Sequence, residues 1–194
     1  MPKFQMTTER NYDFFEVSSS FQKSIRRGME EDSMYWAIEL YNSNYDEYVW
    51  KRMLIIASED IGLAEPNLIS NLQSLYQVYT FLKKKKDKHE PQRLQFTHAV
   101  LMCVRAKKSR YVDNCIFHYW NLTKSTKREI PSFAYDCHTR KGKSMGLVGQ
   151  KGREHFCSSS AQLNNMGSVD GETEMKELFE KAFINPEGSQ GTLL

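Results

Sequence analysis

Apolar residues recur at every third or fourth position through most of the first 124 residues, the spacing that places side chains on one face of an α-helix. The clearest example is Val17, Phe21 and Ile25. Gly28 follows and suits the end of a helix, because glycine readily adopts a left-handed backbone conformation. The pattern therefore predicts a helix that ends at Gly28, preceded by an arm over residues 1–13 with little apolar periodicity.

The same spacing predicts five further helices, which begin near Asp32–Ser33, Tyr45, Pro66–Asn67, Gln92 and Ser109. Each helix has an expected core face. In the order of the helices, these faces are Met34, Ile38 and Tyr41; Tyr48, Val49, Met53 and Ile56; Leu68, Leu72, Leu75, Tyr76, Tyr79 and Leu82; Leu94, His98, Leu101 and Cys103; and Val112, Cys115, Ile116 and Tyr119. The lysine run 83–86 is expected to end the fourth helix in an exposed turn. No apolar–polar alternation persists long enough to favour a sheet, so the prediction is an all-α bundle over residues 14–124.

The pattern changes after residue 124. Residues 125–157 are rich in glycine and in basic side chains, which predicts a loop-rich extension. Residues 158–194 are interpreted as a linker, a short acidic helix and a tail. The expected apolar stripe of that helix is Met175, Leu178, Phe179 and Ala182.

Composition narrows the class of protein. No apolar run approaches the length of a membrane helix, and the first residues do not resemble a secretory signal, so we expect no membrane association and a cytoplasmic location. The four cysteines form no CxxC pair, which favours reduced and mostly buried thiols.

The charge is unevenly distributed, although the net value is only +3. Twelve Lys or Arg lie between residues 105 and 153 against three acids, whereas acids dominate residues 170–187. The candidate phosphate contacts in the basic stretch are Arg140, Lys141, Lys143, Lys151 and Arg153. Phe133, Tyr135 and Phe156 could stack on unpaired bases there. The alternative is a solvated loop whose aromatic residues fix it to the helical core.

Several stretches together resemble the C-terminal region of the RarA/MgsA family of clamp-loader-like AAA+ ATPases, which includes the Werner-helicase-interacting ATPase. They are Phe21–Arg26 (FQKSIR), Tyr35–Ala37 (YWA), Ala57–Ala64 (ASEDIGLA) and Ala106–Ser109 (AKKS) followed by Tyr111. The resemblance implies an all-helical collar that assembles subunits, commonly tetramers, beneath motors acting at replication forks and single-stranded gaps. Lys23, Arg26 and Arg27 lie on the first of these motifs, where they could bind phosphate, meet acidic groups of a partner or offset the helix dipole.

Catalytic and cofactor motifs are weak in this chain. Gly142–Ser144 (GKS) resembles the end of a phosphate-binding P-loop, but Cys137 stands where the first glycine would be, so we expect neither ATP binding nor any other cofactor. Cys137 or Ser144 could act as a nucleophile beside Asp136 and His138, as in a hydrolase. No sequence motif typical of hydrolases surrounds these residues. The Cys137–His138 and His155-x-Cys157 spacings are poor for zinc, so we expect no metal and no enzyme activity.

The carboxylates Glu59 and Asp60 could act as a catalytic pair, but their apolar neighbours favour a structural turn in which they pair with arginine. Our leading hypothesis is a non-catalytic, self-associating collar that contacts single-stranded or forked DNA, or a DNA-bound partner such as a single-stranded-DNA-binding protein. The second is an adaptor or inhibitor that binds an AAA+ ATPase or another replication protein. The third is a small hydrolase or metal enzyme centred on His138.

Overall fold

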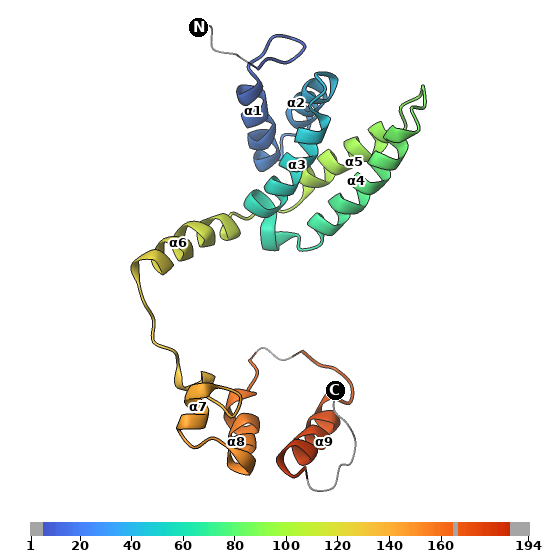
Figure 1. Cartoon of the computed structure of the whole chain (residues 1–194). Helices are drawn as coiled ribbons and strands as arrows, with labels where there is room; N and C mark the ends of the chain where they lie inside the picture. Colours follow the sequence, from blue (N-terminus) through green and yellow to red (C-terminus); the bar gives the residue numbers. More distant parts are fainter. Residues whose placement is uncertain (1–5, 165–166, 187–194) are drawn as a thin grey trace. The chain divides into compact units, whose positions relative to one another are not determined.

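The computed structural model describes residues 6–164 and 167–186, and the chain divides into a first compact unit that ends at Thr126 and a second that begins at Lys127 (Figure 1). Regular structure in the described residues is helical apart from an isolated bridge between Thr7 and Asp13. The all-α prediction is therefore confirmed. Residues 1–5 of the expected arm and the expected tail after Pro186 lie outside the described residues.

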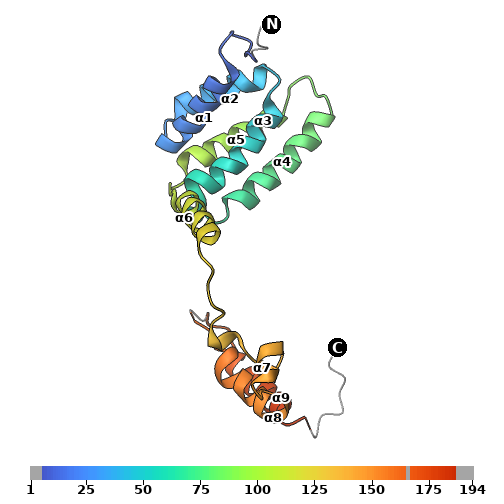
Figure 2. The same ribbon diagram turned by 60° about the vertical axis from the view of Figure 1, so that its left-hand side comes forward.

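The first unit contains α1 (Phe14–Arg27), α2 (Glu30–Asn42), α3 (Asp46–Ile56), α4 (Leu68–Lys84), α5 (Gln92–Arg105) and α6 (Tyr111–Ser125). A π-helical turn (Ala57–Ile61) and a 3₁₀ turn (Gly62–Ala64) join α3 to α4. Figures 1 and 2 show α1 beside α2 and α4 beside α5, and α2 also packs against α5. Helices paired in this way bury one face of each member.

The prediction for α1 is confirmed in detail. Val17, Phe21 and Ile25 are buried in the core, and Gly28 ends the helix with φ +70°. Asp13 caps the other end by accepting hydrogen bonds from the backbone N–H groups of the first turn. The helix therefore has a capping residue at its start, a glycine at its end and one apolar face between them.

The predicted core face of α2 is only partly correct, because Met34 and Tyr41 are half-buried against the core but Ile38 is not. The helix begins at Glu30, and three acidic residues in its first turn complement the helix dipole without a side-chain cap. Ala37 and Leu40 are fully buried, whereas the predicted Ile38 is 45% exposed. Because α2 contacts both α1 and α5, a small residue such as Ala37 lets the neighbouring backbones approach.

The core face of α5 is also displaced from the prediction. Of the predicted residues, Cys103 is buried, whereas Leu94 is 71% exposed, and the buried face also includes Phe96, Ala99 and Val100. This helix is apolar on two adjacent faces, so periodicity alone does not indicate which face meets the core.

Helix α4 keeps its predicted face and ends at Lys84, as expected. Lys83, from the predicted solvated turn, instead forms an ion pair with Asp46 at the start of α3. The buried Tyr79 hydroxyl donates to the same carboxylate. A buried carboxylate with two donors of this kind fixes α4 against α3.

Residues 6–13 form a turn fixed on α2 rather than a free arm. Arg10 pairs with Glu39, whose side chain is only 1% exposed, at 2.6 Å. Thr8, which belongs to this turn, is buried. The pairing satisfies a carboxylate that would otherwise be buried without a counter-ion.

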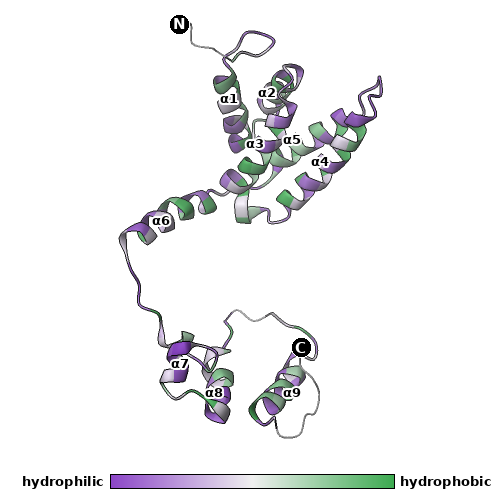
Figure 3. Cartoon of the chain, in the orientation of Figure 1, coloured by the Kyte–Doolittle hydropathy of each residue, from purple (hydrophilic) through white to green (hydrophobic). Residues whose placement is uncertain are grey.

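Helix α6 contains no buried residue, contrary to its predicted core face. Its contacts within the first unit are with the two turns between α3 and α4. Phe117 and Trp120 are 77% and 70% exposed. Figure 3 shows apolar residues distributed along this helix.

The second unit holds more helix than predicted. It contains a 3₁₀ turn (Ser132–Ala134), α7 (Arg140–Ser144), α8 (Gly149–His155), a π-helical turn (Phe156–Ser160) and α9 (Glu172–Ile184). The segment 140–153, expected to be loop-rich, therefore forms two short helices. No helix in the described parts of either unit combines the length and apolar character needed to cross a membrane.

All four cysteines are free. Cys103 and Cys157 are buried, whereas Cys115 and Cys137 are half-buried. Burial raises the pKa of Cys103 to about 12, so its sulfur remains a thiol at neutral pH and packs as a small apolar group.

Candidate functional site

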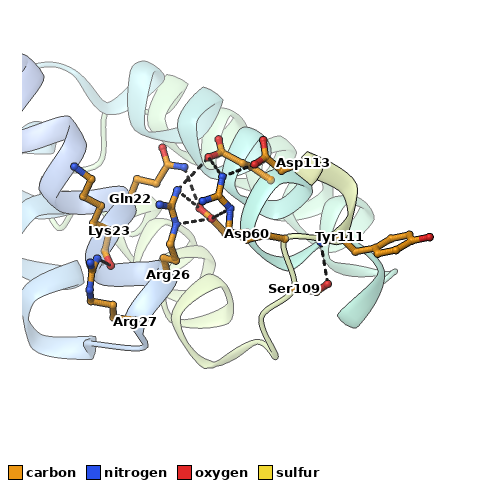
Figure 4. A network of polar contacts seen from close by, with 10 residues as sticks. Gln22, Lys23, Arg26, Arg27, Asp60, Ser109, Tyr111 and Asp113 are labelled. Atoms are coloured by element: carbon orange, nitrogen blue, oxygen red, sulfur yellow. Dashed lines mark hydrogen bonds and ion pairs between the residues drawn. The ribbon is translucent and has the colours of Figure 1, made fainter. Parts of the chain in front are cut away.

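A buried carboxylate joins three of the four motifs that carried the family resemblance. Asp60, in the π-helical turn after α3, has a fully buried side chain. It accepts hydrogen bonds from Gln22 Nε2 at 2.9 Å and from Arg26 Nε at 2.6 Å (Figure 4). The hydrogen bond to Asp60 holds the pKa of Arg26 above its usual value. The first motif is thus fixed to the third.

The fourth motif and the adjacent Arg110 contact the same residue, Asp60. Ser109 N–H donates to the Asp60 backbone carbonyl at 2.9 Å, and Arg110 lies 3.8 Å from the Asp60 side chain. Arg110 also pairs with Asp113 in the first turn of α6. The Asp60 network, made up of Gln22, Arg26, Glu59, Asp60, Arg110 and Asp113, therefore positions the start of α6.

Gly62 brings α6 close to this turn. Its φ of +50° favours glycine, and a Cβ atom there would lie 2.9 Å from Cγ2 of Val112. Both the backbone conformation and the close approach explain why glycine follows Ile61 in this motif.

Lys108 closes the end of α5. Its ammonium donates to the backbone carbonyls of Cys103, Val104 and Ala106 at 2.9, 2.7 and 2.6 Å. Burial lowers the pKa of this lysine. A cation among the last carbonyls of a helix satisfies groups that have no partner within the helix.

The structure separates the three predicted cations of α1. Arg26 also contacts Glu59 at 3.0 Å, so two carboxylates occupy its guanidinium. Lys23 and Arg27 are exposed and lie away from Asp60 in Figure 4. The prediction that Glu59 and Asp60 pair with arginine is confirmed, and this pairing argues against a phosphate contact by Arg26.

Four of the five predicted cations of the second unit are exposed. Arg140, Lys141, Lys143 and Lys151 lie on α7 and α8, and within residues 6–164 and 167–186 none of them has an acidic partner within ion-pair distance. We call these four residues the basic face. Arg153 is half-buried, and its Nε donates to the Ile184 carbonyl at 3.2 Å, so it holds the end of α9 in place.

Two glycines of this segment, Gly142 and Gly152, allow close backbone packing. A Cβ atom at Gly142 would lie 2.0 Å from the Asp136 carbonyl oxygen, and one at Gly152 would lie 2.6 Å from the Leu147 carbonyl oxygen. The Gly142 amide donates to Oγ1 of Thr139, the N-cap of α7. The P-loop-like GKS sequence is therefore part of a short capped helix rather than an open phosphate-binding loop.

The residues around His138 form a cluster in which His138 Nδ1 lies 3.5 Å from both Cys137 Sγ and Asp136 Oδ2. Asp136 accepts from the His138 and Thr139 backbone N–H groups at 2.9 and 3.1 Å. The His138 ring lies edge-on to Phe156 and stacked on Phe183, with ring centroids 5.1 and 6.2 Å apart. Among the described residues, no group of three or more His, Cys, Asp or Glu gathers in a way that could hold a metal ion.

The aromatic residues predicted to stack on bases have different environments. Phe156 packs in the His138 cluster, whereas Phe133 is 66% exposed. Tyr135 lines an open hollow of about 880 Å³ together with Lys127 and Arg128. Lys127 and Arg128 belong to the basic stretch but are not among the predicted site residues.

Comparison with known proteins gives the family. The model of the MgsA AAA+ ATPase C-terminal region matches residues 29–178. The replication-associated recombination protein A of Coxiella burnetii is 29% identical over 139 residues, 71% of this chain and 30% of the relative. The protein of the same name from Escherichia coli K12 is 27% identical over 159 residues, 80% of this chain and 34% of the relative.

A eukaryotic relative matches as well. The ATPase WRNIP1 of Dictyostelium discoideum is 26% identical over 159 residues, which cover 79% of this chain and 17% of the relative. The matched region thus spans about a third or less of the length of these relatives. Since the family model covers most of the chain, from α2 into α9, this chain belongs to the family of MgsA AAA+ ATPase C-terminal regions.

Proposed function

We propose that this chain is a non-catalytic, self-associating helical collar that acts in DNA replication, recombination or repair. The names of its relatives support the process. The structural roles of the Asp136 carboxylate and the Gly142 backbone support the absence of catalysis, because the first holds the turn before α7 and the second is part of a short capped helix.

One observation carries the proposed self-association: α6 is apolar around much of its circumference, yet none of its residues is buried. Tyr111, Ile116, Phe117, Tyr119 and Trp120 are each more than half exposed. A helix with apolar residues on several faces is ordinarily covered by other elements. Covering by neighbouring copies, in a tetramer as the resemblance implies, would bury this surface.

The apolar surface continues from α6 onto α3. An open hollow of about 440 Å³ is lined by Leu54 and Ile55 of α3 and by Val112 and Ile116 of α6. Leu54 and Ile55 are 36% and 38% exposed. A helix of a neighbouring copy could place apolar side chains in this hollow while it packs on α6.

Sedimentation velocity over a wide range of concentrations tests the self-association. We expect a tetramer for the wild-type chain and a monomer for the double variant Phe117→Glu, Trp120→Glu. The matched control is Phe81→Glu, Leu94→Glu, which introduces the same charges at exposed apolar positions of α4 and α5. A wild-type chain that remains monomeric, or a control that dissociates equally, contradicts the proposal.

The proposed DNA contact is supported by the basic face and by the exposed ring of Phe133. Four exposed cations on two short helices provide a surface that phosphates can approach, and an exposed aromatic ring can stack on an unpaired base. Lys127 and Arg128 extend the same charge along the second unit.

Fluorescence anisotropy with labelled single-stranded and forked DNA tests this contact. The triple variant Arg140→Glu, Lys141→Glu, Lys143→Glu should weaken binding, and each cation removed should lower the slope of log affinity against log salt by about 0.7 for single strands. The control Lys84→Glu, Lys85→Glu, Lys86→Glu changes the net charge equally on the first unit. Equal loss in both variants would mean that overall charge, rather than the basic face, governs binding.

A further inference from the structure

We infer that the surface on and beside α9 is a docking site for a basic, amphipathic peptide segment of a partner protein. The site lies within the second unit and uses neither the basic face nor α6, so it goes beyond the proposed function. It consists of a hollow between α9 and residues 157–163, together with the apolar stripe of α9 that adjoins it.

The stripe of α9 is exposed although the sequence pattern predicts a buried face. No residue of α9 is buried, and Met175, Leu178 and Phe179 are 64%, 55% and 48% exposed. The helix is held by its last turn, where Phe183 stacks on His138 and Arg153 binds the Ile184 carbonyl. Phe179 of the stripe stacks on the anchoring Phe183, with ring centroids 5.1 Å apart, whereas Met175 and Leu178 lie farther from the anchored turn and remain accessible.

The hollow beside the stripe has a volume of about 330 Å³. Its apolar lining comes from Cys157, Ala161, Leu163 and Phe179. This volume is at the lower end of the range of ligand-binding clefts, about 300–1,000 Å³, and suits one or two apolar side chains better than a whole cofactor. Phe179 belongs to both the hollow and the stripe, so one ligand can occupy both.

Charge identifies the kind of ligand. Glu172 and Glu180 line the hollow, and among the residues that the structure describes its lining has one cation, Lys176, which lies 3.9 Å from Glu180. Glu174 and Glu177 are exposed on the same helix, and Asp170 precedes it. An apolar surface bordered by carboxylates complements lysines or arginines that flank apolar anchors, whereas it repels nucleic acid and acidic peptides.

The fitting ligand is therefore a peptide with one large apolar side chain for the hollow, a second apolar residue for Met175 or Leu178, and basic residues near both. This is the recognition mode in which an amphipathic segment lays apolar anchors on a complementary surface. The partner's basic residues would meet Glu172 and the exposed glutamates of α9.

Selection from a random peptide library displayed on phage, with the full chain as target, tests the inference. We expect enrichment of peptides that combine Lys or Arg with Leu, Ile, Phe or Trp. An enriched peptide, synthesised with a fluorescent label, should bind the variant Leu163→Asp about tenfold more weakly, the factor for losing one buried apolar side chain. Val169→Asp is the matched control, since Val169 is 68% exposed in the same unit and does not line the hollow.

A second variant separates loss of the site from loss of folding. Glu172→Gln keeps the shape of the hollow and should weaken the same peptide while reducing the salt dependence of its binding. Three outcomes overturn the inference: enriched peptides that lack basic residues, peptides that bind Leu163→Asp and Glu172→Gln as tightly as wild type, or no enrichment because a second copy of the chain covers α9. Each is distinguishable from failure of the proposed function, which is tested on α6 and on the basic face.

Discussion

The Nε atom of Arg26 donates to the buried Oδ1 atom of Asp60 at 2.6 Å and so connects α1 to the turn that follows α3. Arg110 approaches the same oxygen from the segment before α6, but at 3.8 Å. Asp60 thus depends chiefly on Arg26 for its charge-assisted hydrogen bond, with Gln22 as a neutral donor.

Arg26→Ala should destabilise the first unit by about 3 kcal/mol, because removing one partner leaves a buried carboxylate without its counter-ion. The measurement is urea unfolding followed by tryptophan fluorescence. Arg27→Ala, one position along α1 and exposed, should change the stability by no more than about 0.5 kcal/mol. Equal effects of the two substitutions would contradict the central position of Asp60.

Gly62→Ala should destabilise the first unit by about 1–3 kcal/mol, because any other residue is strained at this φ and its Cβ would collide with Val112. Gly28→Ala is the matched control: it is also strained at φ +70°, but its Cβ would meet its nearest neighbour, the Val104 carbonyl oxygen, at 4.0 Å. Gly62→Ala should therefore have the lower urea midpoint. The reverse order would mean that α6 does not press on this turn.

Gly142→Ala should open the second unit, since its Cβ would lie 2.0 Å from a backbone oxygen that cannot rotate away. Hydrogen exchange should show lost protection over residues 136–157, with the amides of the first unit as an internal reference. Gly167→Ala, where no atom of the described residues beyond its chain neighbours lies within 4 Å of the added Cβ, should leave the exchange pattern unchanged.

Asp46 should contribute to the acid sensitivity of the first unit. Burial alone would raise the pKa of Asp46, but the hydrogen bonds from Lys83 and Tyr79 outweigh it and hold the pKa below its usual value of 3.8. A carboxyl with a lowered folded-state pKa stabilises the fold fully above its unfolded pKa, and this stabilisation is lost as the pH falls through the folded value.

The stability difference between the wild-type chain and Asp46→Asn should therefore be largest near neutral pH and shrink as the pH falls below about 3.8. Urea midpoints at a series of pH values provide the measurement. A difference that stays constant down to low pH would mean that the ionised form of Asp46 does not hold α4 against α3.

Helix existence was largely predictable from periodicity, but the buried face was predictable only where one face alone is apolar. Val17, Phe21 and Ile25 meet that condition, and their burial is confirmed. Ile38 and Leu94 do not meet this condition, because each lies beside another apolar face of its helix. Which of the two faces is buried depends on which helices pack there. Residues far apart in sequence decide that packing, and no local pattern contains it.

The candidate site was predictable to a similar degree. Pairing of Glu59 and Asp60 with arginine was expected, because carboxylates amid apolar residues need a cation. That Arg26 would supply it was not, since its sequence neighbours Lys23 and Arg27 offer the same charge. The glycines near residue 142 were interpreted as loop residues, because spacing does not distinguish a flexible glycine from one required by a close backbone contact.

Because Lys108 caps α5, the accessibility of its amine reports whether the first unit is folded. Its nitrogen is enclosed by three carbonyls, whereas the adjacent Lys107 is exposed. Acylating reagents should therefore modify Lys107 readily and Lys108 only when the first unit opens. Mass spectrometry of the segment that contains Lys107 and Lys108 would then show whether the first unit stays folded inside any larger assembly. Lys108 serves as the probe, and the neighbouring Lys107 serves as its reference.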